Sequence, residues 1–172
     1  MTDTMRDGMN SQTQGQLIAD EIRRAYRGNA WHGPALSELL AGLTQEEALQ
    51  RPIPAAHNIW ELALHITSWS NIVLRRLTGG NPAPYDGEDW PEPGEWSDAH
   101  WAAIVEALGE SHERLCEVVT GLRDEDLRKN APQSENSVAV MLHGVAQHGA
   151  YHGGQIALLR KVVTTKHRRT AL

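Results

Sequence analysis

The sequence has only one cysteine and no long hydrophobic run. Cys116 has no second cysteine to pair with, so an internal disulfide is excluded, which fits a reducing compartment. No apolar stretch approaches the ~20 residues that a membrane-spanning helix needs. The chain opens with MTDTMRDGMNSQTQGQ, which is too polar and acidic for a secretory signal. We therefore expect a cytoplasmic protein that does not enter a membrane.

Several common functional motifs are also missing. The sequence has no glycine-rich phosphate-binding loop and no nucleophile elbow. It has no segment of useful length that alternates as a strand does, and no repeat at the period of a solenoid. Its formal net charge of −6 makes it a poor candidate for binding nucleic acid or an anionic membrane. The basic cluster at residues 166–169 is interpreted as a solvated terminus.

The sequence does contain four long amphipathic segments. Its 172 residues, 40% of them hydrophobic, suit one globular domain. The segments run from Thr13 to Arg27, from the cap Asn58 to Leu77, from the cap Ser97 to Gly121, and from the cap Ser137 to about Val163. We therefore predict an all-α fold, a four-helix bundle over residues 13–163, with a disordered N-terminus at 1–12 and a tail at 164–172.

The connections between these helices are of two kinds. Short turns of helix are expected after Pro34, after Thr44, and between the third and fourth long helices. Residues 81–96 instead form a loop rich in proline, glycine and acidic residues. A loop of this length is unusual in a compact domain. It can border a functional site or cover a neighbouring chain, and the sequence leaves both open.

Three histidines lie on the apolar faces of the predicted helices. His65 lies between Leu62 and Trp69 on the second long helix. His148 and His152 are four residues apart, so they lie one turn apart on one face of the fourth. Three imidazoles leave the fourth position of a tetrahedral metal open, as in catalytic rather than structural zinc sites. The pattern therefore indicates one divalent metal ion held by these three histidines.

Other interpretations of these residues stay open. A lone histidine on an apolar face is more often a core residue bonded to backbone, and HxxxH also arises by chance, so a bundle without metal remains a hypothesis. Glu61, one turn before His65, can orient a ligand, accept a proton from metal-bound water, or favour the positive end of its helix. His57 can line the pocket or serve the start of that helix. Cys116 is interpreted as buried filler rather than a nucleophile.

Two motifs resemble one known family. Residues 148–155 (HGAYHGGQ) are similar to the HxxxHxGQ signature of the DinB-like/YfiT-like superfamily. Residues 57–66 (HNIWELALHI) resemble that family's second helix, which supplies the first metal histidine. The resemblance covers residues 13–163. Tyr151 and Gly153 stand where the commonest form, HHRGQ, has histidine and arginine, so a role of that arginine in gripping an anionic substrate does not carry over.

The resemblance implies an up-down-down-up four-helix bundle, frequent homodimers, and one divalent metal ion at His65, His148 and His152. Members of the family include thiol-dependent S-transferases, isomerases and proteins described as metal-dependent hydrolases. We therefore expect a metal-dependent enzyme, a hydrolase or a thiol-dependent transferase, that acts on a small molecule, with a thiol as one candidate. The alternative is a non-catalytic metal-binding dimeric scaffold.

The remaining expectations concern the metal, the pocket and the dimer. Zinc and nickel are favoured, although imidazole also suits other metals such as iron, and manganese stays open. The pocket mouth is expected where the start of the second long helix meets the middle of the fourth, with His57 and Glu61 at the entrance and Trp69 deeper. Three tryptophans offer apolar surface for a homodimer or for folding back over the pocket: Trp90, Trp96 and Trp101.

Overall fold

Four long and three short helices make up the computed structural model, which describes residues 12–170. The long helices are α1 (Gln14–Arg27), α4 (Ile59–Leu77), α5 (Asp98–Thr120) and α7 (Val138–Thr170). The short ones are α2 (Leu36–Leu40), α3 (Gln45–Leu49) and α6 (Asp124–Arg128). Within residues 12–170 there is no strand, only an isolated bridge between Asn130 and Ser137. The predicted all-α class is confirmed.

The starts of the long helices are fixed by local hydrogen bonds from capping side chains. The Thr13 hydroxyl accepts from the backbone N–H of Gln16 at 3.2 Å, and the Asn58 Oδ1 accepts from the N–H of Glu61 at 2.9 Å. The Ser97 hydroxyl caps α5 in the same way. Each bond satisfies an N–H that has no partner within the helix. These predicted helix starts are therefore confirmed.

The end of the last helix differs from the sequence-based expectation. α7 continues to Thr170, past the predicted end near Val163. The apolar stripe stops near Val163, but the sequence after it contains no glycine or proline to end the helix, so the backbone hydrogen bonds continue. The predicted disorder of the N-terminus concerns residues 1–12, of which residues 1–11 lie outside the described part of the chain.

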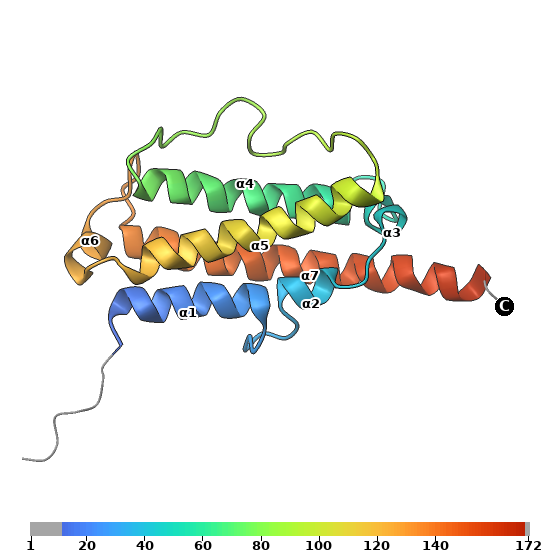
Figure 1. Ribbon diagram of the computed structural model, residues 1–172, viewed down its shortest axis with the longest axis horizontal. Coiled ribbons are helices and arrows are strands. Elements are labelled where there is room, and N and C mark those ends of the chain that lie inside the picture. The colour runs from blue at the N-terminus through green and yellow to red at the C-terminus, as the bar shows by residue number, and fades with distance from the viewer. Residues whose placement is uncertain (1–11, 171–172) are drawn as a thin grey trace, which may run out of the picture.

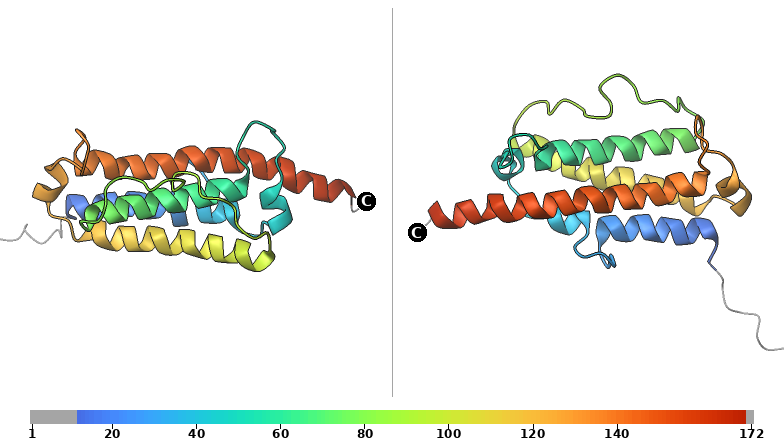
Figure 2. Two further views of the ribbon diagram at one scale, coloured as in Figure 1. Left: turned by 90° about the horizontal axis from the view of Figure 1, so that it is seen from above. Right: turned by 180° about the vertical axis from the view of Figure 1, so that it is seen from behind.

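The four long helices pack side by side, each against two others. α4 and α5 pack together, α1 packs on α5, and α7 completes the ring by packing on both α1 and α4. α1 and α7 run in one direction, while α4 and α5 run in the other (Figure 1). Of the short helices, α6 lies at one end of this ring and α3 at the other, while α2 continues the line of α1 along α7 (Figures 1 and 2). No helix in residues 12–170 is long and apolar enough to cross a membrane.

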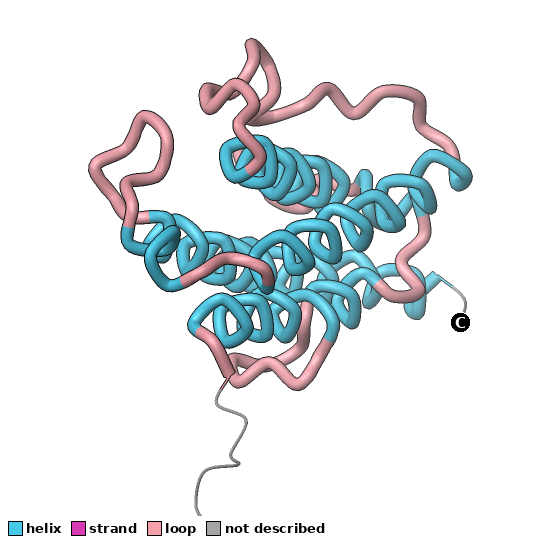
Figure 3. Tube along the Cα trace, turned by 60° about the vertical axis from the view of Figure 1, so that its left-hand side comes forward, coloured by secondary structure: helices cyan, strands magenta, loops and turns pink. Residues whose placement is uncertain are grey.

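The loop between α4 and α5 lies on its own chain. It runs back along α4 to reach the start of α5 (Figures 1 and 3). Arg75 binds both carboxylate oxygens of Glu88 at 2.8 Å, and Trp60 donates its indole N–H to the carbonyl of Pro93 at 3.2 Å. The loop therefore packs along α4 of its own chain, and a role in covering a neighbouring chain stays a prediction.

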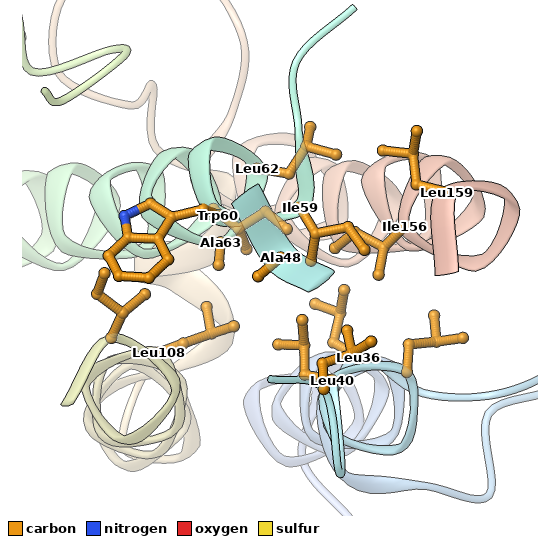
Figure 4. Close-up of a cluster of buried hydrophobic side chains, with 14 of the residues drawn as sticks. Leu36, Leu40, Ala48, Ile59, Trp60, Leu62, Ala63, Leu108, Ile156 and Leu159 are labelled. Carbon is orange, nitrogen blue, oxygen red and sulfur yellow. The ribbon is translucent and has the colours of Figure 1, made fainter. Parts of the chain in front are cut away.

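The apolar core consists of two clusters, one toward each end of the ring of helices. The first includes Leu36, Trp60, Leu108 and Ile156, and Figure 4 shows its side chains from α2, α3, α4, α5 and α7 facing one another. The second contains residues from α1, α4, α5, α6 and α7. His112 on α5 and His148 and His152 on α7 occupy the interval between the two clusters, and His65 on α4 lies in the last turn of the first cluster, next to Ile66. The helices are thus held together on both sides of a polar layer.

Gly15 in α1 tests how tightly α1 packs on α5, and Gly154 in α7 serves as its control. A Cβ on Gly15 would lie 2.6 Å from the carbonyl oxygen of Val119 and 2.9 Å from that of Leu122, and backbone cannot yield cheaply. We expect Gly15→Ala to destabilise the metal-free protein by about 1–3 kcal/mol. A Cβ on the exposed Gly154 would have no other atom within 4 Å, so Gly154→Ala should stabilise by about 0.5–1 kcal/mol. Urea unfolding followed by circular dichroism measures both, and equal effects would contradict the close approach.

Candidate metal centre

Three histidines from two helices come together between the two apolar clusters. His65 comes from α4, and His148 and His152 come from successive turns of α7. One ring nitrogen from each lies within 4.8 Å of the other two, and the Nε2 atoms of His65 and His148 are 3.0 Å apart. His65 and His152 are buried, and His148 is partly buried. The predicted meeting of His65 with the HxxxH pair is therefore present in the fold.

The outward ring nitrogens of two of these histidines are held by hydrogen bonds. The carbonyl oxygen of Asp89 lies 2.6 Å from Nδ1 of His65, and the amide oxygen of Gln155 lies 2.7 Å from Nδ1 of His152. Because both oxygens only accept, each Nδ1 carries the proton and each Nε2 keeps its lone pair. Metal-binding histidines are oriented by the same kind of bond. The arrangement thus aims unprotonated nitrogens at the centre of the cluster.

The cluster also favours uncharged imidazoles. Burial lowers the pKa of His148 to about 4, and the neighbouring His152 and His65 contribute to the same shift. Burial likewise lowers the pKa of His152, against the opposing effect of its bond to Gln155. Near neutral pH both rings are therefore uncharged, which is the form that coordinates a metal.

The donor atoms fit a divalent transition metal. Metal–nitrogen bonds of ~2.0–2.1 Å in a tetrahedral site place ligand nitrogens roughly 3.3 Å apart. One separation here, 3.0 Å, is close to that value, and all three nitrogens lie within 4.8 Å of one another. Without a metal, Nε2 of His148 would carry a proton and donate it to Nε2 of His65 across the 3.0 Å that separates the two atoms. The residues can therefore hold a metal, and the metal-free hydrogen bond is the alternative state of the same cluster.

Trp90 covers one side of His65. Its indole is stacked between the rings of His57 and His65, with centroid distances of 3.6 and 3.8 Å and interplanar angles of 7° and 9°. The next residue back in the loop, Asp89, accepts a hydrogen bond from the indole of Trp69 at 2.6 Å. The loop thus supplies both a hydrogen-bond acceptor and an aromatic cover to the histidine cluster.

Glu61 lies at the start of α4 and is engaged there. Its carboxylate accepts from the backbone N–H of Asn58 at 3.1 Å and pairs with Arg51 and with His57. Burial raises the pKa of Glu61, but the bonds from Asn58, Arg51 and His57 outweigh it and lower the pKa overall. The carboxylate is not part of the three-histidine group. These contacts show that Glu61 takes part in capping the start of α4. A role of Glu61 in proton transfer stays a prediction.

Two cavities lie on either side of the histidine cluster. One, of about 390 Å³, is lined by His65, His148 and Arg76, and is called the Arg76 cavity below. The other, of about 650 Å³, is lined by His57, His152 and the exposed Tyr151, and is called the Tyr151 cavity. The Tyr151 cavity lies at the expected mouth, between the start of α4 and the middle of α7. Trp69, expected deeper in the same pocket, lines the Arg76 cavity instead, and Glu61, expected at the entrance, lines neither cavity. The Arg76 cavity was not anticipated from the sequence.

The other histidines have separate partners. His143 pairs with Glu21 at 2.7 Å, and His100 bonds the carbonyl of Glu95. His112 is buried, bonds the carbonyl of Leu108 at 3.0 Å and stacks on the ring of Tyr26. None of these belongs to the three-histidine group.

Asp89 is the contributor to the site that sequence reasoning missed, and in its loop only the unusual length and composition of residues 81–96 gave a signal. Trp90, in the same loop, takes one of the two roles weighed for the tryptophans, because it folds back over the site of its own chain. Gln155, the last residue of the HGAYHGGQ motif, bonds a histidine of its own helix. His57 lines the Tyr151 cavity as well as pairing with Glu61, so both roles weighed for it occur together.

An all-helical fold with three converging imidazoles defines a class of helical protein able to hold a metal ion. The comparison with protein families is more specific. The family model of the DinB superfamily matches residues 30–156, a span that contains all three histidines. The chain belongs to the DinB superfamily. No curated protein and no solved structure matched the chain.

The reactivity of the lone cysteine, Cys116 on α5, tests whether the core around it is closed to solvent. Cys116 is 1% exposed, and burial raises the pKa of its thiol to about 11 from 9.0. Because each pKa unit is a factor of ten in thiolate, native Cys116 at pH 8 should react with iodoacetamide at least about 100-fold more slowly than in urea. Mass spectrometry of timed samples measures the rates. Similar rates in the two states would show that Cys116 is accessible.

Proposed function

We propose that the protein binds one divalent metal ion through His65, His148 and His152, and uses it as the open site of a metal-dependent enzyme, a hydrolase or a thiol-dependent transferase. The observation that carries the proposal is the convergence of three ring nitrogens within 4.8 Å, with two of the rings oriented from behind by Asp89 and Gln155. Family membership supports it, because the match spans all three positions.

The absence of a fourth ligand supports an open coordination position. Within residues 12–170, no carboxylate or thiol joins the three histidines in the cluster. Asp89 has a carboxylate oxygen 3.4 Å from Nδ1 of His65, but this lies on the far side of the ring from Nε2. Three protein ligands and a free position are the pattern of catalytic zinc sites. Both cavities adjoin the cluster, so a substrate can approach.

A divalent metal held there would supply Lewis-acid chemistry, lowering the pKa of a bound water or of a substrate thiol. Three neutral imidazoles leave the charge of the metal uncompensated, so the site favours an anion. The protein's own part is to orient the ligands through Asp89 and Gln155 and to limit water through Trp90, which is stacked on His65. Zinc and nickel remain the favoured metals, since imidazole suits both.

The fold and assembly implied by the family belong to the same proposal. The directions of α1, α4, α5 and α7 support the up-down-down-up four-helix bundle (Figure 1). A homodimer and a cytoplasmic location stay predictions. Of the three tryptophans considered for a dimer surface, Trp90 stacks on its own site and Trp101 is buried, which leaves Trp96, 67% exposed.

A scaffold with a structural metal is the second candidate. The observation that favours it is the cover over the cluster, because Trp90 shields His65 and both His65 and His152 are buried. In that case the metal would add to stability as a bound ligand does. The two candidates differ in whether the fourth coordination position exchanges with solvent.

Metal content tests the proposed binding. Protein prepared without an affinity tag, loaded with zinc and dialysed, should retain about one ion per chain by elemental analysis. His148→Ala should lower the affinity by at least about 100-fold, because it removes one of three ligands. His143→Ala, on the same helix but paired with Glu21, is the matched control and should bind as the wild type does. Wild-type protein that retains no zinc or nickel would refute the proposal.

The open position is tested with cobalt(II) in place of zinc. Azide is a small anion that can replace a water molecule on an accessible metal. We expect azide to change the visible spectrum of the cobalt-loaded protein in a saturable manner, because three histidines leave one position free. A spectrum that stays unchanged up to high azide concentration would favour the structural metal of the scaffold instead.

A further inference from the structure

The Arg76 cavity has a composition that points to a particular kind of ligand. At one end lie His65 and His148. Its walls over α4 and α7 are formed mainly by Ile66, Val73, Met141 and Val145, and Ser70 and His112 also line it, each bonded to a carbonyl of its own helix. Among the residues that the structure describes, Arg76 is the only arginine or lysine that lines it. The cavity therefore combines a metal-binding end, an apolar middle and one permanent positive charge.

Arg76 lies on the same side of α4 as His65. The two are eleven residues apart, which is close to three full turns of an α-helix. The Arg76 side chain lies over the indole of Trp69, with its Cζ atom 5.8 Å from the ring centroid. The centroid of that indole ring is in turn 6.2 Å from the His148 ring centroid. These two distances place the guanidinium within about 12 Å of the His148 ring.

The guanidinium of Arg76 has donors to spare. Its Nε donates to the carbonyl of Pro82 at 2.7 Å, and within residues 12–170 no carboxylate lies within 4.0 Å of its nitrogens. The neighbouring Arg75 differs, because both of its terminal nitrogens are bound to Glu88. Arg76 therefore keeps its two terminal nitrogens for an anion, in the fork geometry that suits a carboxylate.

The one acidic residue of the cavity is used elsewhere. The Asp89 carboxylate accepts from the edge of the Trp69 indole at 2.6 Å and lies 3.4 Å from Nδ1 of His65. Arg76 lies over the face of the same indole rather than at its edge. The negative charge of Asp89 is thus engaged with the histidine end of the cavity, and the positive charge of Arg76 is not neutralised by an ion pair.

We propose that the Arg76 cavity binds a small molecule that carries a carboxylate at one end, an apolar middle, and a metal-binding group at the other end, and that Arg76 determines this specificity by binding the carboxylate. The metal-binding end rests on the function proposed above. The separation of at most about 12 Å sets the length, which a chain of about six carbons spans together with its end groups.

The test uses two thiols that differ only at the far end. 6-Mercaptohexanoate and 6-mercaptohexanol are titrated into cobalt(II)-loaded protein, and binding is followed by the thiolate-to-cobalt absorption. The wild type should bind the carboxylate at least tenfold more tightly than the alcohol. Arg76→Gln should abolish this preference and leave the affinity for the alcohol unchanged, while Arg76→Lys should keep part of it. Arg24→Gln, which removes an exposed charge paired with Asp20, is the matched control and should keep the preference in full.

The outcomes separate a failure of this inference from a failure of the metal site. If cobalt and both thiols bind but the wild type shows no preference, or Arg76→Gln keeps it, the inference is wrong and the metal site stands. If Arg76→Gln weakens both thiols equally, Arg76 only anchors the loop through Pro82, and the inference is again wrong. If cobalt does not bind, the metal proposal fails. Hexanoate and hexanol titrated into metal-free protein, followed by tryptophan fluorescence, then decide whether Arg76 selects a carboxylate.

Discussion

The burial of three imidazoles between two apolar clusters is the constraint on which the rest of this structure depends. A buried polar group without a hydrogen bond costs about 1–3 kcal/mol, so each ring must be satisfied inside the fold. Asp89 and Gln155 satisfy the outer nitrogens of two rings, and the inner nitrogens face one another. In the described part of the chain no buried side-chain polar atom is left without a partner. The polar groups of the layer are thereby satisfied inside the fold.

This constraint also explains the position of the long loop. The carbonyl of Asp89 can reach His65 only if residues 81–96 lie along α4, and several bonds hold them there, including Arg75 to Glu88 and Trp60 to the carbonyl of Pro93. Trp90 then stacks on His65 from the loop side. A segment whose composition is typical of a polar, acidic connection thus forms one wall of the site. Its length is needed because it must span α4 from end to end.

The two cavities give the cluster two different sides. The Tyr151 cavity is larger and lined mainly by apolar residues, several of them exposed, such as Ile53 and Leu158. The Arg76 cavity is smaller and has a charge at one end. A metal ion held by the three histidines would be accessible from both cavities, one lined mainly by apolar residues and the other carrying the charge of Arg76. An enzyme that joins or separates two molecules would use both, whereas a scaffold would need neither.

The sequence by itself determined the helices and the candidate ligands on each helix. Caps such as Thr13 and Asn58 act on backbone groups two or three residues away, and the four-residue spacing of His148 and His152 places them on one face of α7 whatever the rest of the fold does. Only the tertiary structure decided that His65 faces this pair, that Asp89 and Trp90 complete the site, and that Arg76 reaches back over Trp69. Most of these contacts join residues far apart in the chain. They depend on how helices pack and where a loop runs, which local spacing does not encode.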